Sequence, residues 1–214
     1  MSTTETMTVH EALCALKMLD KRIVAEIPYL PWAVTNKHIN KVIDGKSIGE
    51  FEEGISARYI KVTDLMRRQF AIKCAVTKSN ATTTVEIGGK QYTVAEAIWM
   101  KNHAVKFAQD LGHKMLVDYN MAKRAADAAN GESLERRAQT HLEATFGKTD
   151  MKGNGDEAEA TRKRFIEEQT LDIVDPLGII ARVDSINDWV DEFLTKVDSA
   201  LSVSNAKTEI AVEY

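Results

Sequence analysis

The sequence is poor in the residues that punctuate a many-stranded fold. Its 214 residues include three prolines and eleven glycines. Tight turns depend on these residues, so their scarcity argues against a sandwich, a barrel or another all-β fold with frequent turns. With 44% hydrophobic and 28% charged residues, the composition is nevertheless that of a folded chain. Long helices are therefore the expected architecture.

The sequence also shows no sign of a disulfide framework, a signal peptide or a membrane span. Cys14 and Cys74 are too few for a disulfide framework, and no apolar segment precedes a small-residue cleavage site. The longest wholly apolar runs are only a few residues, far below the roughly 20 needed to cross a bilayer. We expect a cytoplasmic protein with no membrane partner.

Charge is divided unevenly along the chain. Residues 1–130 contain 18 basic and 14 acidic side chains, a net charge of +4, whereas residues 131–214 contain 10 and 18, a net charge of −8. One interpretation is a set of solvated helix faces of opposite sign that pair within or between subunits. The other is a basic site for an anion in the N-terminal half.

Two capping boxes mark helix starts. Thr8 with Glu11, and Thr93 with Glu96, have the spacing at which a side-chain oxygen and a carboxylate cap each other's backbone N–H groups. The first helix should end at Pro28. The helix that starts at Thr93 has an apolar stripe as far as Ala122, and a similar stripe continues after Asn130-Gly131. The Asn130-Gly131 dipeptide therefore either ends this helix or only kinks it.

Further helices are expected over about 55–77, over 157–171 and from Asp175-Pro176 onward. The last of these repeats apolar residues at alternating three- and four-residue steps from Ile179 to Leu201, which is coiled-coil spacing. Residues 32–54 read as a short helix or an irregular loop. Residues 147–156 read as a flexible linker within one helical domain, residues 1–214.

The clearest strand signal is Thr82–Ile87 and Lys90–Thr93 on either side of Gly88-Gly89, a β-hairpin. Two internal echoes accompany it: residues 8–13 resemble 93–98, and residues 75–83 resemble 200–208. Unless these echoes are chance, a C-terminal strand over 208–212 should pair with the hairpin, because two strands alone are marginal. The predicted fold is mainly α, with long antiparallel helices, coiled-coil-like packing and a small β-hairpin joined by a C-terminal strand.

These features resemble the septicolysin-like helical family of bacterial and phage proteins. The resemblance lies in the Ser-Asn-Ala-Thr segment, the Gly-Gly hairpin and the Thr-Val-Ala-Glu-Ala-Ile helix start, mainly over residues 75–120. It implies long antiparallel helices, self-association and a phage origin, which would place the protein in the cytoplasm of a host cell. It implies no activity.

Catalytic and metal-binding motifs are not found. Gly45-Lys46-Ser47 lacks the upstream glycine and strand of a phosphate-binding loop. His10 and Cys14 share one helix face, but two ligands do not make a metal site. There is no nucleophile signature. We therefore predict no catalytic residue, no metal, no cofactor and no enzyme activity.

A basic cluster is the remaining functional signal. Between Gly54 and Lys78 there are six cations and one acid, Asp64, and a tryptophan with further polar residues lies just upstream. Arginine forks suit phosphate oxygens, and aromatic rings stack on bases. The predicted ligand-binding residues are Trp32, Lys37, His38, Lys41, Arg58, Tyr59, Lys61, Arg67 and Arg68.

The predicted function is that of a non-enzymatic homo-oligomer that binds or sequesters an anionic, nucleotide-like small molecule. Duplex DNA is not an expected partner, because the net charge is −4 and no recognition module is evident. Two alternatives stay open. In one, the cations pair with the acidic C-terminal half instead of a ligand. In the other, the chain is a structural virion or assembly protein that acts through helix and strand contacts.

Overall fold

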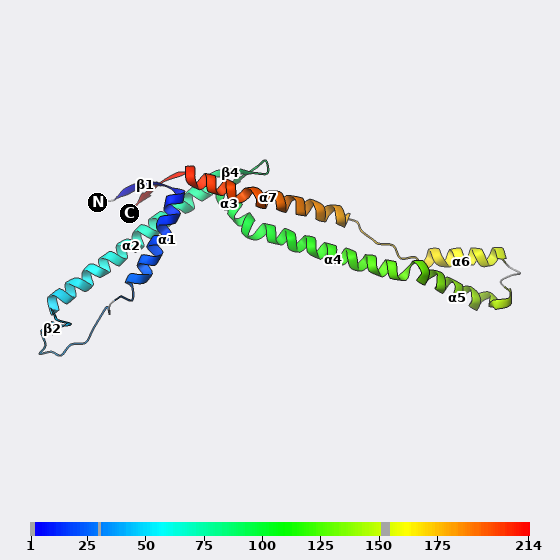
Figure 1. Cartoon of the computed structure of the whole chain (residues 1–214), viewed down its shortest axis with the longest axis horizontal. Helices are drawn as coiled ribbons and strands as arrows, with labels where there is room; N and C mark the ends of the chain where they lie inside the picture. Colours follow the sequence, from blue (N-terminus) through cyan, green and yellow to red (C-terminus); the bar gives the residue numbers. More distant parts are fainter. Residues whose placement is uncertain (1–2, 30, 151–154) are drawn as a thin grey trace. The chain divides into compact units, whose positions relative to one another are not determined.

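The computed structural model describes residues 3–29, 31–150 and 155–214, and it confirms the mainly α fold with long helices and a small β-hairpin. The chain divides into two compact units (Figure 1). The strand-bearing unit comprises Met1–His103 and Glu192–Tyr214, and the helical unit comprises Ala104–Asp191. That all 214 residues form one domain stays a prediction.

The strand-bearing unit pairs two long antiparallel helices, α1 and α2, and it also contains three two-stranded sheets (Figure 1). Its elements are β1 (Thr4–Thr8), α1 (Val9–Glu26), β2 (Val42–Ile43), β3 (Lys46–Ser47), α2 (Ile48–Thr82), β4 (Thr84–Ile87), β5 (Lys90–Thr93), α3 (Val94–Trp99), the end of α7 (Ile179–Lys207) and β6 (Glu209–Glu213).

The helical unit contains α4 (Val105–Ala129), α5 (Gly131–Asp150), α6 (Gly155–Gln169) and the first part of α7. A π-helical turn, Met100–Ala104, leads into α4. α5 and α6 lie side by side and antiparallel (Figure 1). The predicted linker at 147–156 begins at Gly147, where φ is +74°, and its residues 151–154 lie outside the described residues. No helix in the described part of the chain is long and apolar enough to cross a bilayer.

Both predicted capping boxes are confirmed, and a third starts α2. Glu11 and Glu96 each accept hydrogen bonds from the N–H and hydroxyl of the threonine three residues before them, at 2.7–2.9 Å. Ser47 and Glu50 make the same arrangement. These bonds to the charged carboxylate hold the pKa of Glu11, Glu50 and Glu96 below its ordinary value.

The structure corrects the predicted bounds of two helices. α2 runs from Ile48 to Thr82 rather than over about 55–77, because a helix tolerates internal glycines at modest cost. Before it, Asp44 and Gly45 adopt positive φ in the turn between β2 and β3. The last helix begins at Ile179 instead of Asp175, because the Asp175 carboxylate accepts the Ile179 N–H at 2.8 Å and so caps the helix from outside.

The predicted partner of the C-terminal strand is wrong. β4 pairs with β5 around Gly88-Gly89, as expected, but β6 pairs antiparallel with β1 and not with this hairpin. The pairing places Met7 opposite Ile210, and both side chains are buried. The prediction failed because it assigned no strand to residues 4–8, which form β1.

The two sequence echoes are equivalent in structure. Thr84 lies opposite Thr93 in the hairpin, and Glu209 lies opposite Thr8 in the other pair. The same backbone hydrogen bond closes both pairs. The Val94 N–H donates to the carbonyl oxygen of Thr83, just before β4, and the Val9 N–H donates to that of Thr208, just before β6, each at 2.9 Å. The β6–β1 pair is thus a second copy of the β4–β5 hairpin, built from two distant segments.

A core joins α1, α2 and the β1–β6 pair. Ile72 and Val212 are fully buried in it, and Ala12 faces them from α1. The other members are Met7, Val9, Leu19, Val76 and Ile210. The core fixes α2 against the last strand, and so determines which α2 side chains lie beside the residues that follow β6.

Candidate functional site

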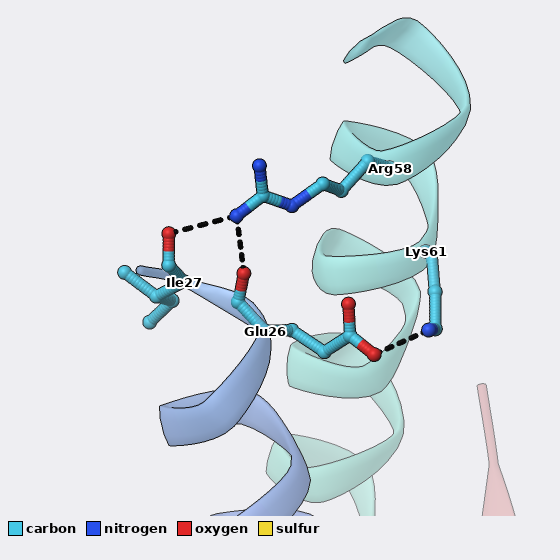
Figure 2. A network of polar contacts seen from close by, with 4 residues as sticks. All are labelled: Glu26, Ile27, Arg58 and Lys61. Carbon is cyan, nitrogen blue, oxygen red and sulfur yellow. Dashed lines mark hydrogen bonds and ion pairs between the residues drawn. The ribbon is translucent and has the colours of Figure 1, made fainter. Parts of the chain in front are cut away.

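The C-terminal end of α1 is held by Arg58 of α2 (Figure 2). The last carbonyl groups of a helix have no partners within it, and the last turn of α1 has no basic residue of its own. Arg58 Nη2 donates to the carbonyl oxygens of Glu26 and Ile27, at 3.0 Å for Ile27. Only 8% of Arg58 is exposed. Its guanidinium therefore caps α1 from a neighbouring helix.

Trp32 belongs to the same cluster. Its ring centre lies 4.2 Å from Arg58 Cζ, and the Tyr29 ring centre lies 6.0 Å away. Trp32 Nε1 donates to the Ile27 carbonyl at 3.0 Å. Two residues predicted to bind ligand thus contact each other and the end of α1, an arrangement that positions the segment after α1.

The other predicted residues of this region are exposed. Lys61 forms an ion pair with Glu26 beside the cap (Figure 2), and Tyr59 is 62% exposed on α2. Lys37, His38 and Lys41 lie in the segment between α1 and β2. The structure does not place these three beside Arg67 and Arg68, whose hollow has other lining residues.

Arg67 and Arg68 line a hollow of about 440 Å³ on the strand-bearing unit, called the Tyr214 hollow here. It forms where α2 passes the ends of the β1–β6 pair, because the shared core fixes these elements together. Its lining residues are Thr3, Lys61, Asp64, Leu65, Arg67, Arg68 and Tyr214. Three predicted cations therefore meet at one place with an aromatic ring.

Carboxylates accompany these cations. Arg68 Nη2 donates to both oxygens of Glu5, at 2.9 and 3.1 Å, and its Cζ lies 5.6 Å from the Tyr214 ring centre. Arg67 pairs with Asp64 at 2.8 Å. The acids that pair with Lys61, Arg67 and Arg68 are Glu26, Asp64 and Glu5, and all three belong to the N-terminal half. The alternative that the acidic C-terminal half pairs with the basic cluster is therefore wrong for these three cations.

Both arginines that line the hollow have hydrogen-bond donors outside their ion pairs. Arg68 Nε is buried and has no hydrogen-bond partner among the described residues. Arg67 is 65% exposed and uses only Nη1 in its ion pair. The exposed Arg67–Asp64 pair contributes about 0–1 kcal/mol, so a stronger acceptor can displace Asp64 at little cost. The arrangement can hold an oxyanion next to an aromatic ring.

The described part of the chain has no candidate metal site. It contains no cluster of three or more His, Cys, Asp or Glu side chains that could hold a metal ion. His10 Nε2 lies 4.0 Å from Cys14 Sγ on the exposed side of α1, and Cys74 is also exposed.

Comparisons with models of known protein families, with curated proteins and with solved structures find no match to this chain. The resemblance to the septicolysin-like family therefore rests on the sequence features alone and stays a prediction.

Sequence reasoning missed Tyr214, Thr3 and Glu5. The pairing of β1 with β6 brings Thr3 and Tyr214 to the lining of the hollow, and it brings Glu5 to Arg68. The available signal was the repeated Thr-Val-x-Glu-Ala helix start: since the residues before Thr93 form a strand, those before Thr8 could have been assigned one too.

Proposed function

We propose that this chain is a non-enzymatic, self-associating helical protein that binds an anionic, nucleotide-like ligand in the Tyr214 hollow and thereby sequesters it. The observation that carries the proposal is the meeting of Lys61, Arg67 and Arg68 with the Tyr214 ring in one hollow. The resemblance in sequence extends the proposal to a phage-encoded protein in the host cytoplasm.

The chemistry of the hollow suits a phosphate attached to a ring. A guanidinium presents paired donors that match phosphate oxygens, and Arg68 Nε is a buried donor still without a partner. The Tyr214 ring is half-buried, and its accessible part offers a surface on which a base can stack. Trp32 and Arg58 then act as positioning residues for the segment after α1, and ligand contacts of Lys37, His38, Lys41 and Tyr59 stay predictions.

A nucleotide panel tests the proposal. Added ATP, ADP, AMP or cyclic dinucleotides should raise the melting temperature of the wild type, because a ligand that binds only the folded state stabilises it. At 100 times Kd the gain is about 2.7 kcal/mol, or roughly 5–10 °C for a chain of this size. Differential scanning fluorimetry measures the shift.

Two variants locate the effect. Arg67→Glu should abolish the shift, whereas Arg22→Glu, a change at an exposed α1 cation outside the hollow, should retain it. Lys41→Glu tests whether the segment after α1 contacts the ligand. Loss of the nucleotide-dependent rise in melting temperature in this variant would extend the binding site to that segment. No shift with any nucleotide, or an unchanged shift in Arg67→Glu, contradicts the proposal.

A second candidate function is that of a structural virion or assembly component. The observation in its favour is the exposed apolar face of α4, where Phe107, Leu111 and Met121 are each more than half exposed. This function predicts indifference to nucleotides and presence in purified phage particles. Absence from such particles would count against it.

A further inference from the structure

We propose that the exposed face of α4 pairs antiparallel with the same face of a second copy of this chain. The proposal rests on the self-association included in the proposed function and names the surface responsible. It is argued entirely from the helical unit, whereas the Tyr214 hollow belongs to the strand-bearing unit.

The face is a stripe with alternating steps of four and three residues. Its members are Phe107, Leu111, Lys114, Asp118, Met121 and Ala125. Phe107, Leu111 and Met121 are 61%, 55% and 62% exposed. This is the spacing of the a/d positions of a two-helix coiled coil, which keeps one line of side chains toward a partner helix. Four of the six positions are apolar, and the central two, Lys114 and Asp118, carry opposite charges.

This stripe differs from the face that α4 already buries. Gly112 is buried, and a Cβ added there would lie 3.7 Å from Ile186 of α7. At 100° per residue, Gly112 lies about 140° around the helix from Phe107. Contact with α7 therefore leaves the Phe107–Ala125 stripe open.

The order of residues along the stripe is self-complementary in the antiparallel direction. With the two-fold axis between Lys114 and Asp118, Leu111 faces the partner's Met121 and Phe107 faces the partner's Ala125. Lys114 then faces the partner's Asp118, and the two-fold repeats this pairing of opposite charges.

The charges of Lys114 and Asp118 favour an antiparallel orientation of the two α4 helices and a second copy of this chain as the partner. A parallel pair in register would set Lys114 against the partner's Lys114, and like charges repel. Within one chain Lys114 and Asp118 already form an ion pair with 71% and 50% of their side chains exposed. The stripe spans about 27 Å of a helix that is already folded, so association carries no helix-nucleation cost.

Light scattering coupled to size-exclusion chromatography tests the interface on the full chain at about 100 µM. The wild type should elute with at least twice its chain mass of 23.9 kDa. Lys114→Asp sets two acids against each other and should lower the mass at least two-fold. The double variant Lys114→Asp with Asp118→Lys restores opposite charges and should restore the wild-type mass.

A matched control lies on the same helix. Lys123 and Asp127 form an ion pair of the same spacing, and Lys123 lies about 160° around the helix from Phe107. Lys123→Asp should leave the mass unchanged, and far-UV circular dichroism checks that each variant keeps its helices. A monomeric wild type, an unchanged mass in Lys114→Asp or the absence of rescue overturns the proposal.

The nucleotide panel separates this proposal from ligand binding. Lys114→Asp should keep the nucleotide-dependent rise in melting temperature, because it leaves every residue of the Tyr214 hollow in place. Loss of assembly with retention of that rise supports the proposed interface. A nucleotide shift in a wild type that is monomeric by light scattering overturns the interface while leaving the hollow's function standing.

Discussion

Replacing Ile72 by alanine is expected to lower the free energy of unfolding of the strand-bearing unit by about 2–5 kcal/mol. Ile72 is fully buried in the core between α1, α2 and the β1–β6 pair. The truncation removes apolar contacts and leaves a cavity that the packed strands cannot easily fill. Urea denaturation followed by circular dichroism measures the loss.

Phe70 provides the matched control. It lies two residues earlier on α2 and is 70% exposed, although its side chain is larger. Phe70→Ala should change the free energy of unfolding by no more than about 0.5 kcal/mol. A large loss for Phe70→Ala together with a small loss for Ile72→Ala would contradict the assignment of the core, and with it the placement of α2 beside Tyr214.

Replacing Arg58 by methionine is the second large effect. We expect a loss of about 2–5 kcal/mol, because hydrogen bonds from a charged donor contribute about 1.5–3 kcal/mol and a guanidinium over an aromatic ring adds about 0.5–2 kcal/mol. Both contacts are present, to the end of α1 and to Trp32. Urea denaturation measures the loss, and a change in tryptophan emission should accompany it.

Arg67→Met is the control for this variant. Arg67 is also an arginine of α2, but its partner is the Asp64 carboxylate and this ion pair is exposed. Its removal should therefore cost less than about 1 kcal/mol. If both variants lost the same free energy, Arg58 would not be the cap of α1.

Local sequence signals predicted the helices well. Capping boxes at Thr8 and Thr93, and the Gly88-Gly89 turn, depend on residues only a few positions apart, and the structure has each of them. The start of α2 was missed because three glycines between 45 and 54 read as breaks. The box of Ser47 and Glu50 outweighs them, and it could have been found from spacing alone.

Strand pairing was harder to predict, because it is decided by tertiary contacts. The run over 208–212 has the alternation of a strand, but alternation does not identify a partner. The partner is β1, which lies at the other end of the sequence. The shared pattern around Thr8 and Thr93 contained this information, since each Thr-Val-x-Glu-Ala start follows a strand.

The basic cluster illustrates the same limit. Its composition predicted cations gathered on α2, and the structure brings Lys61, Arg67 and Arg68 to one hollow. It did not predict that Arg58 caps α1, because the two carbonyl acceptors are 31 and 32 residues away in the sequence. Nor did it find Glu5, which is 63 residues from Arg68.

Calorimetric titration of the nucleotide panel into the wild type and Arg68→Gln tests ligand binding in the Tyr214 hollow most directly. We expect at least one nucleotide to bind the wild type, and Arg68→Gln to weaken that binding at least ten-fold, since the charged donor beside Tyr214 is lost. Arg22→Gln should bind as the wild type does. No binding by the wild type, or equal affinity in Arg68→Gln, would contradict the account.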